Sequence, residues 1–174
     1  MKRLLGKVIT VRSASGNPND TIIDGTGHFH VVQCVSGEGP ATVLEGFTIT
    51  GGNANGLNFS DSMGGGMINI SSSPTVRHCV FIGNTAANDG GGMGNESSSP
   101  LVSHCIFRGN SATNGGGLDD FNASSSTVRH CVFLDNTASI SGGGVSSNAG
   151  MPIGSDQLSV QRQRGELWRR YARR

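Results

Sequence analysis

A repeat of 26 residues constrains this chain more than any other feature of its sequence. Three segments share the pattern Val-x-His-Cys-[Val/Ile]-Phe-x-x-Asn, and they occupy residues 75–84, 101–110 and 127–136. Three serines precede each segment. Glycine triplets, each followed by an apolar residue, stand at 64–66, 90–92, 115–117 and 142–144. The triplet spacing varies by one residue while the His-Cys spacing does not, so loops absorb the insertions and the apolar segments keep their register.

Short strands explain the repeat better than helices do. The apolar stretches are rich in Val, Ile and Phe and are bounded by Gly, Ser and Asn, a pattern typical of strands. Glycine contributes 28 of 174 residues, about twice its usual share, and a repeat gives these glycines fixed places at turns. We therefore predict an all-β fold, a parallel β-helix whose coils stack at about 4.8 Å.

Stacked coils place equivalent side chains in columns. Cys and Phe of each repeat share one parity and are predicted to point inward, with Val as a further inward column if the chain bends at the histidine. Asn is predicted to form an amide ladder at a turn, and the cysteines are expected to stay buried and free. The predicted columns are Cys79, Cys105 and Cys131; Phe81, Phe107 and Phe133; Val76, Val102 and Val128; and Asn84, Asn110 and Asn136.

The N-terminal part fits a degenerate version of the same repeat. Predicted strands lie at 8–11, 21–25, 31–34 and 42–50. They add about two coils, for about five coils in all, and we assign residues 1–150 to one β-helix domain because neighbouring repeats need one another to bury their apolar faces.

These motifs resemble the right-handed parallel β-helix repeat proteins, whose fold is shared with pectate lyases. Within that group, Phe-x-x-Asn (Phe81 and Asn84, for example) and Gly-Gly-[apolar] (Gly92 and Met93) resemble the paired tetrapeptide motifs of polymorphic outer-membrane proteins, a family of bacterial autotransporter-type surface proteins. The resemblance covers about residues 8–148. It implies a right-handed β-helix, an extracellular or cell-surface location, and a role in adhesion.

The two ends of the chain depart from this pattern. We expect no signal peptide, because Lys7 and Arg12 interrupt the apolar run near the N-terminus. Residues 151–174 form a basic tail with six of the 13 Lys and Arg residues and the only Trp and Tyr. Three interpretations remain open for it: a helix over about 157–173, capped by Asp156, that covers the end of the solenoid; a disordered tail; or an interrupted reading frame that makes it non-native sequence.

Charge and hydropathy exclude some partners. The formal net charge is +1, which provides no general attraction to nucleic acid or anionic membrane, and no apolar run is long enough for a transmembrane helix. We therefore expect no nucleic-acid partner and no transmembrane segment.

Three acidic residues are the candidates for catalysis: Glu96, Asp119 and Asp120. Asp120 is expected to stack over Asn95 in the preceding coil, while Glu96 shares the parity of Asp119. A Glu96/Asp119 pair fits an acid–base pair or half of a Ca²⁺ site, and it equally fits an ordinary solvated loop. We expect no other cofactor or metal. The glycine triplets are interpreted as turns rather than phosphate loops, because no strand–glycine loop–helix context surrounds them.

Two outward columns are also predicted. His78, His104 and His130 suit either a transition-metal site or simple turn positions, and we favour turns. Val80, Ile106 and Val132 alternate with the inward residues and, with Ile82 and Leu134 beside them, form an apolar outer stripe. Such a stripe indicates an interface, with self-association as one use.

Three hypotheses of function follow. The first is a non-catalytic bacterial surface or secreted β-helix protein, or a fragment of one, that acts in adhesion or in surface or glycan interaction. The second is a carbohydrate-active β-helix enzyme, a polysaccharide lyase or glycoside hydrolase, or an incomplete remnant of one, with a polysaccharide as partner. The third is a truncated frame without independent function.

Overall fold

The computed structural model describes residues 2–147 and 159–161. In this part of the chain all strand pairs are parallel, and the only helical element is the short 3-10 helix η1 (Ser60–Ser62). The described residues contain no helix long and apolar enough to cross a membrane. The predicted all-β architecture of stacked parallel strands is therefore confirmed, and it is compatible with a β-helix.

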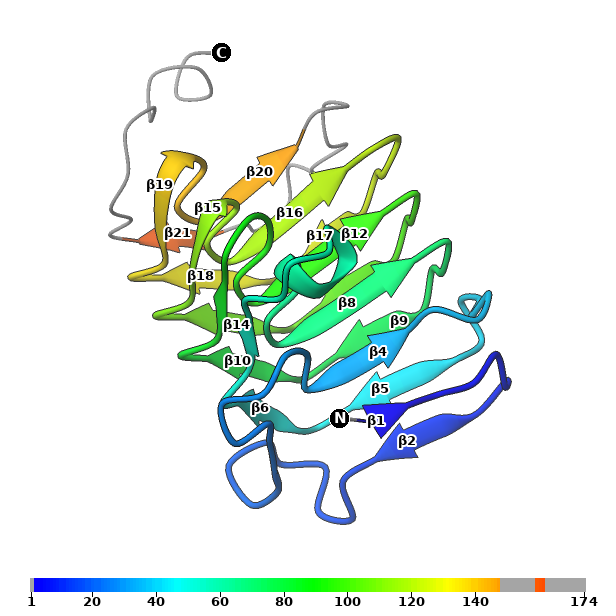
Figure 1. Cartoon of the computed structure of the whole chain (residues 1–174). Helices are drawn as coiled ribbons and strands as arrows, with labels where there is room; N and C mark the ends of the chain where they lie inside the picture. The colour runs from blue at the N-terminus through cyan, green and yellow to red at the C-terminus, as the bar shows by residue number, and fades with distance from the viewer. Residues whose placement is uncertain (1, 148–158, 162–174) are drawn as a thin grey trace.

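The strands form four sheets, which we call A to D (Figure 1). Sheet A contains, in spatial order, β1 (Lys2–Arg3), β4 (Val32–Cys34), β8 (Met67–Ile70), β12 (Met93–Glu96), β16 (Leu118–Phe121) and β20 (Val145–Ser147). Sheet B contains β2 (Thr10–Arg12), β5 (Val43–Glu45), β9 (Thr75–Arg77), β13 (Leu101–Ser103) and β17 (Thr127–Arg129). Sheet C contains β3 (Ile22–Asp24), β6 (Thr48–Thr50), β10 (Val80–Ile82), β14 (Ile106–Arg108), β18 (Val132–Leu134) and β21 (Ser159–Gln161). Sheet D contains β7 (Asn53–Ala54), β11 (Thr85–Ala86), β15 (Ser111–Asn114) and β19 (Thr137–Ser141).

Within one coil of the chain, successive strands belong to different sheets. Neighbouring strands in a sheet therefore come from successive coils. Phe107 lies beside Phe81 and Phe133, as the 26-residue repeat requires. The degenerate N-terminal segments also form strands, although β2 begins only at Thr10 and leaves Val8 75% exposed.

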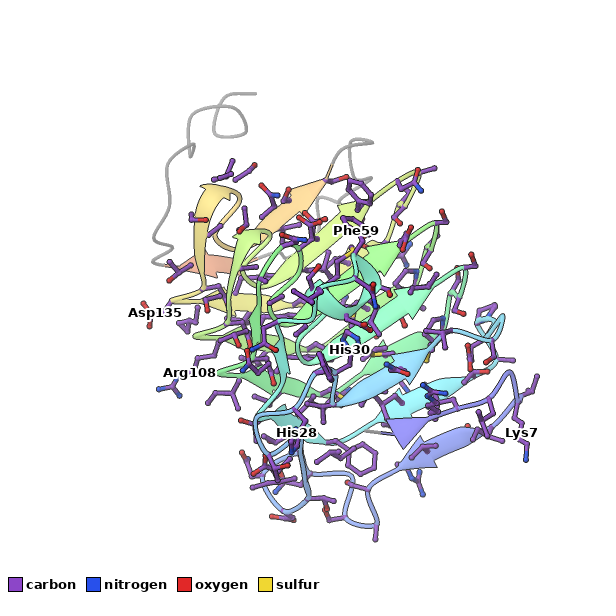
Figure 2. All side chains as sticks on the ribbon, viewed as in Figure 1. Lys7, His28, His30, Phe59, Arg108 and Asp135 are labelled. Carbon is purple, nitrogen blue, oxygen red and sulfur yellow. The ribbon has the colours of Figure 1, made fainter. Side chains whose placement is uncertain are left out.

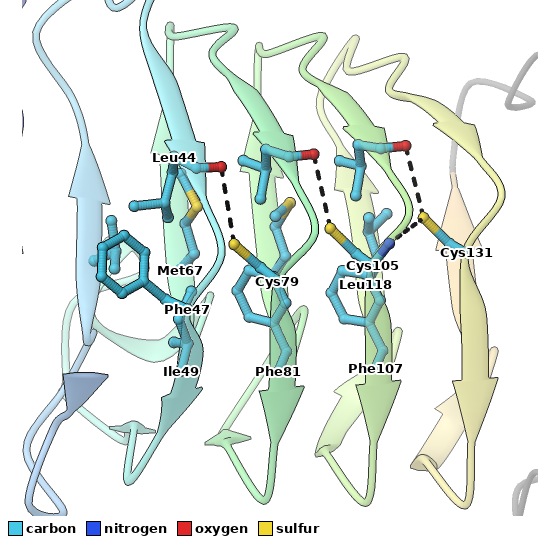
Figure 3. Packing of buried hydrophobic residues seen from close by; sticks show 14 of the residues in the cluster. Leu44, Phe47, Ile49, Met67, Cys79, Phe81, Cys105, Phe107, Leu118 and Cys131 are labelled. Carbon is cyan, nitrogen blue, oxygen red and sulfur yellow. Dashed lines mark hydrogen bonds between the residues drawn. The ribbon is translucent and has the colours of Figure 1, made fainter. Parts of the chain in front are cut away.

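Inward-facing side chains of sheets A, B and C fill the core (Figure 3). The Phe rings stack with centroids 4.7 Å apart and planes only 3–4° from parallel. The column Cys79, Cys105 and Cys131 is buried and free of disulfides, and each thiol donates to a backbone carbonyl of the preceding coil, as Cys105 does to Val76. The predicted Cys, Phe and Val columns are all confirmed, with exposures of 0–1%.

A turn at each histidine explains why the Val two residues before it and the Cys directly after it both point into the core. His78, His104 and His130 have φ of 52–53°, the left-handed region that ordinary side chains avoid. This turn interrupts the alternation between sheets B and C, so Val76 and Cys79 both point into the core. At the equivalent turn of the preceding coil the residue is Gly46, with φ of 78°.

The predicted amide ladder is present and fully buried. The Asn110 side chain accepts from the Asn84 backbone N–H at 2.9 Å and donates to Phe81 O at 3.0 Å and to Asn136 Oδ1 at 2.9 Å. Because each buried amide satisfies backbone groups at the turn, the ladder ties one coil to the next at the junction of sheets C and D.

The glycine triplets are turns, as predicted. Gly90 has φ of +64°, and a Cβ added to Gly91 would collide with the backbone oxygen of Ser111. Glycine is needed here because coils approach one another closely and the backbone is left-handed.

The C-terminal tail differs from the helix prediction where the structure describes it. Ser159–Gln161 form strand β21, which pairs parallel with β18, so for these three residues the predicted helix over about 157–173 is wrong. Strand β18 has unpaired main-chain N–H and C=O groups on this side of sheet C, and pairing with β21 provides their hydrogen-bond partners. The rest of the tail, 151–158 and 162–174, and the predicted domain boundary at 150 lie outside the described residues.

Truncating the middle ring of the Phe stack tests the core. We expect Phe107→Ala to lower the free energy of unfolding by about 3–5 kcal/mol, because it removes a buried ring and leaves a cavity. Arg108→Ala, on the same strand but exposed, should change it by less than about 0.5 kcal/mol. Chemical denaturation of both variants makes the comparison, and equal losses would contradict this packing.

Candidate functional site

A loop covers the outer face of sheet A. Residues 55–63, with η1, lie over this face in front of β8 (Figure 1). Phe59 of the loop packs against Phe121 of β16 with ring centroids 5.1 Å apart, and Asn88 Nδ2 donates to Ser62 Oγ at 2.7 Å. Ile68, which faces outward from β8, is therefore only 1% exposed.

Asp120 lies inside the solenoid and is fully buried. It stacks over Asn95 and Asn69 as predicted, and it ends a hydrogen-bonded row in which Asn69 donates to Asn95 at 2.7 Å and Asn95 to Asp120 at 2.8 Å. Its second oxygen accepts from the backbone and hydroxyl of Ser126. Both carboxylate oxygens are occupied, so Asp120 is placed to hold the fold rather than to contact a substrate.

Asp119 points to the opposite face of the same strand and is 2% exposed. Burial raises the pKa of its carboxyl to about 7. Asp89 and Asp120 add to the rise, and a hydrogen bond from Ser146 opposes it. Asp119 therefore exchanges a proton near neutral pH, as a general acid or base must.

Glu96 faces outward on the neighbouring strand β12, where its register partner is Phe121. It shares a face with Asp119, as predicted, but it is partly exposed whereas Asp119 is buried. The two carboxyls are thus in different environments and do not frame one open cleft.

These residues do not fit a Ca²⁺ site, which takes six to eight oxygen ligands. Both oxygens of Asp120 already accept hydrogen bonds inside the solenoid, and Glu96 and Asp119 lie in different environments on the outer face. Within residues 2–147 and 159–161 no three His, Cys, Asp or Glu side chains are grouped to hold a metal ion.

The histidine column faces outward at the corner between sheets B and C. His78, His104 and His130 stack with ring centroids 4.9 and 4.7 Å apart. Partial desolvation and the two neighbouring imidazoles lower the pKa of His104. Neighbouring rings are only 19° and 25° from parallel, so their in-plane nitrogen lone pairs point in similar directions and do not converge on one ion.

A shallow groove of about 270 Å³ follows this column. Its walls are the loop at Gly16–Pro18 on one side and His78, His104, Val80 and Ile106 on the other. The loop is held over sheet C by a hydrogen bond from Thr48 Oγ1 to Pro18 O at 2.8 Å. The groove thus joins the imidazole stack to the apolar outer stripe.

The outer stripe is partly exposed. Val80 and Val132 are partly buried and Ile106 is 39% exposed, while the Phe that follows each of them in the sequence is buried. Arg108 projects from the end of β14, a central strand of sheet C, and Asp135 from the turn that follows β18 (Figure 2).

A second cleft, of about 210 Å³, was not predicted from the sequence. It lies on the outer face of sheet A beside the covering loop, where Figure 2 shows His30 below Phe59. Its lining residues are Arg3, His30, Gln33, Val35, Ser60, Asp61, Ile68 and Ile70. Apart from Ile68 and Ile70 of β8, these residues come from the non-repeating N-terminal turns and the covering loop, so no periodicity in the sequence groups the set.

Comparison with known proteins finds no match: no protein family matches the chain, and neither does any curated protein or solved structure.

The raised pKa of Asp119 predicts how stability changes with pH. The folded state binds a proton between pH 3.8 and about 7 that the unfolded chain has released, so stability falls as pH rises through this range, by about 4 kcal/mol at most. Asp119→Asn should remove this fall and make the protein more stable than the wild type at pH 8. Thermal melting from pH 4 to 8 makes the measurement, with the exposed Asp135→Asn as control. An unchanged slope in Asp119→Asn would contradict the assignment.

Proposed function

We propose that this chain is a right-handed parallel β-helix of about five coils that acts by binding rather than by catalysis, as a bacterial surface or secreted repeat protein with a role in adhesion. The observation that carries the proposal is the repeated outer surface at the corner of sheets B and C. There three stacked histidines and three aliphatic residues recur with the coil spacing beside a groove.

Backbone strain supports a role for the histidines. Each adopts a left-handed conformation that Gly46 adopts without a side chain at the equivalent turn. Such a conformation costs a non-glycine residue free energy, and the imidazole is present at three successive coils. A surface that binds through these rings accounts for that cost.

The aliphatic stripe supports the same proposal. Val80, Ile106 and Val132 are carried outward on adjacent strands in register, so they form one continuous apolar row instead of scattered exposed residues. Continuous apolar rows of this kind are typical of interfaces.

Substituting the stripe tests this function. We expect Val80→Ser/Ile106→Ser/Val132→Ser to lower the adhesion of beads coated with the full chain to a glycan array and to cultured cells at least tenfold. The matched control is Thr75→Ser/Leu101→Ser/Thr127→Ser, which alters the outward row of sheet B in the same three coils. Sedimentation of both variants tells loss of self-association from loss of glycan binding. Equal adhesion of the two variants would contradict the proposal.

Asp119 supports a second candidate function, a carbohydrate-active enzyme or a remnant of one, because a carboxyl with a pKa of about 7 suits acid–base catalysis. In that case polysaccharides, including polyuronates, are degraded, and Asp119→Ala or Glu96→Ala abolishes the degradation while Asp135→Ala does not. The first candidate requires no degradation by any of these proteins.

A further inference from the structure

The cleft on the outer face of sheet A contains three polar side chains from separate parts of the chain. Arg3 comes from β1, His30 from the segment before β4, and Asp61 from η1 in the covering loop. The cleft lies on a different sheet from the groove and stripe of the proposed function, and the inference drawn from it is independent of that function.

Each of the three side chains is held by one hydrogen bond that leaves a second polar group available. Arg3 Nε donates to Gln33 Oε1 at 2.9 Å, which leaves the terminal guanidinium nitrogens. Asp61 Oδ2 accepts from Asn58 Nδ2 at 3.0 Å, which leaves Oδ1. The side chains are thus oriented before any ligand arrives, which lowers the entropic cost of binding.

His30 is held in the same way. Its Nδ1 lies 3.1 Å from Gly64 O, and because a carbonyl only accepts, Nδ1 must donate the hydrogen. Burial lowers the pKa of this imidazole, against opposing contributions from the Gly64 backbone, from Asp61 and from the Met63 backbone. The neutral ring then presents Nε2 as an acceptor.

Opposite charges share the cleft without neutralising each other. The ion pairs among the described residues are those of Glu45 with Arg77 and with His78, and neither involves Arg3 or Asp61. The cleft therefore offers a cationic hydrogen-bond donor in Arg3, an anionic acceptor in Asp61 and a neutral acceptor in His30.

The floor of the cleft is apolar. Ile70 of β8 is partly exposed and Val35, which follows β4, is 39% exposed, whereas Ile68 is buried under the covering loop. An aliphatic group of a ligand would lose water-exposed surface against these side chains.

We propose that this cleft binds a small zwitterion of the α-amino-acid type with an aliphatic side chain. The ligand carboxylate pairs with the Arg3 guanidinium, the ammonium donates to Asp61 Oδ1 and His30 Nε2, and the side chain lies on Ile70 and Val35. A sugar acid satisfies Arg3 but leaves the charge of Asp61 uncompensated and adds a second carboxylate nearby, so the charges favour the zwitterion.

Titration of the full chain with L-leucine, followed by amide chemical shifts, tests this site. We expect saturable shifts around His30, Asp61 and Ile70. 4-Methylpentanoate, which lacks the ammonium, and leucinamide, which lacks the carboxylate, should each bind at least tenfold more weakly. Asp61→Asn should lower leucine affinity at least tenfold and leave 4-methylpentanoate unaffected, and Arg3→Gln should lower the affinity for leucine but not for leucinamide.

Matched controls separate this site from effects on folding. Asp20→Asn removes the charge of a carboxylate held by the same kind of loop bond, from an Asn three residues earlier, and Arg12→Gln removes an exposed arginine of β2. Neither should change leucine binding, and thermal melting verifies that all four variants are folded. The proposal is overturned if leucine gives no saturable shifts at millimolar concentration, if 4-methylpentanoate binds as tightly as leucine, if galacturonate binds more tightly, or if Asp20→Asn weakens binding as much as Asp61→Asn.

Discussion

The structure depends on the register in which each turn of chain hydrogen-bonds to the next. A shift by one residue would move Phe107 from the core to the solvent face and separate Asn110 from its partners. The strands are only two to five residues long, so backbone pairing alone specifies register weakly. The buried Phe stack and amide ladder supply the specificity, because their rings and amides match only in one alignment.

The same alternation decides the chemistry available to the acidic residues. Asp119 and Asp120 are adjacent in sequence, yet one faces a covered outer surface and the other the interior. Asp120 accepts three hydrogen bonds and serves the fold. Asp119 has a pKa near neutrality because burial removes its carboxyl from water. The hydrogen bonding and the pKa of these two carboxyls therefore depend on which face of the strand each occupies and on how deeply that face is buried.

The repeat predicts much of the interior of the solenoid, but it predicts little about the sites on its surface. The inward columns, the Asn84–Asn136 ladder and the stacking of Asp120 over Asn95 follow from a spacing of 26 residues and the alternation of strands. The cleft of Arg3, His30 and Asp61 could not be predicted, because its members come from the irregular N-terminal turns and one long loop. Glu96 and Asp119 were correctly placed on one face, but their spacing carries no information about the tertiary contacts that bury only Asp119.

The sequence by itself determined the parallel all-β architecture, the identity of the core columns and the places of the glycine turns, since these depend on local periodicity and on backbone conformations that few residues adopt. Only the tertiary structure decided which outward side chains are solvated. Residues 55–63 fold back over sheet A, and the loop at Gly16–Pro18 borders the histidine column. These contacts join residues from different coils, so the burial, and with it the pKa and ligand chemistry, comes from packing that no single repeat encodes.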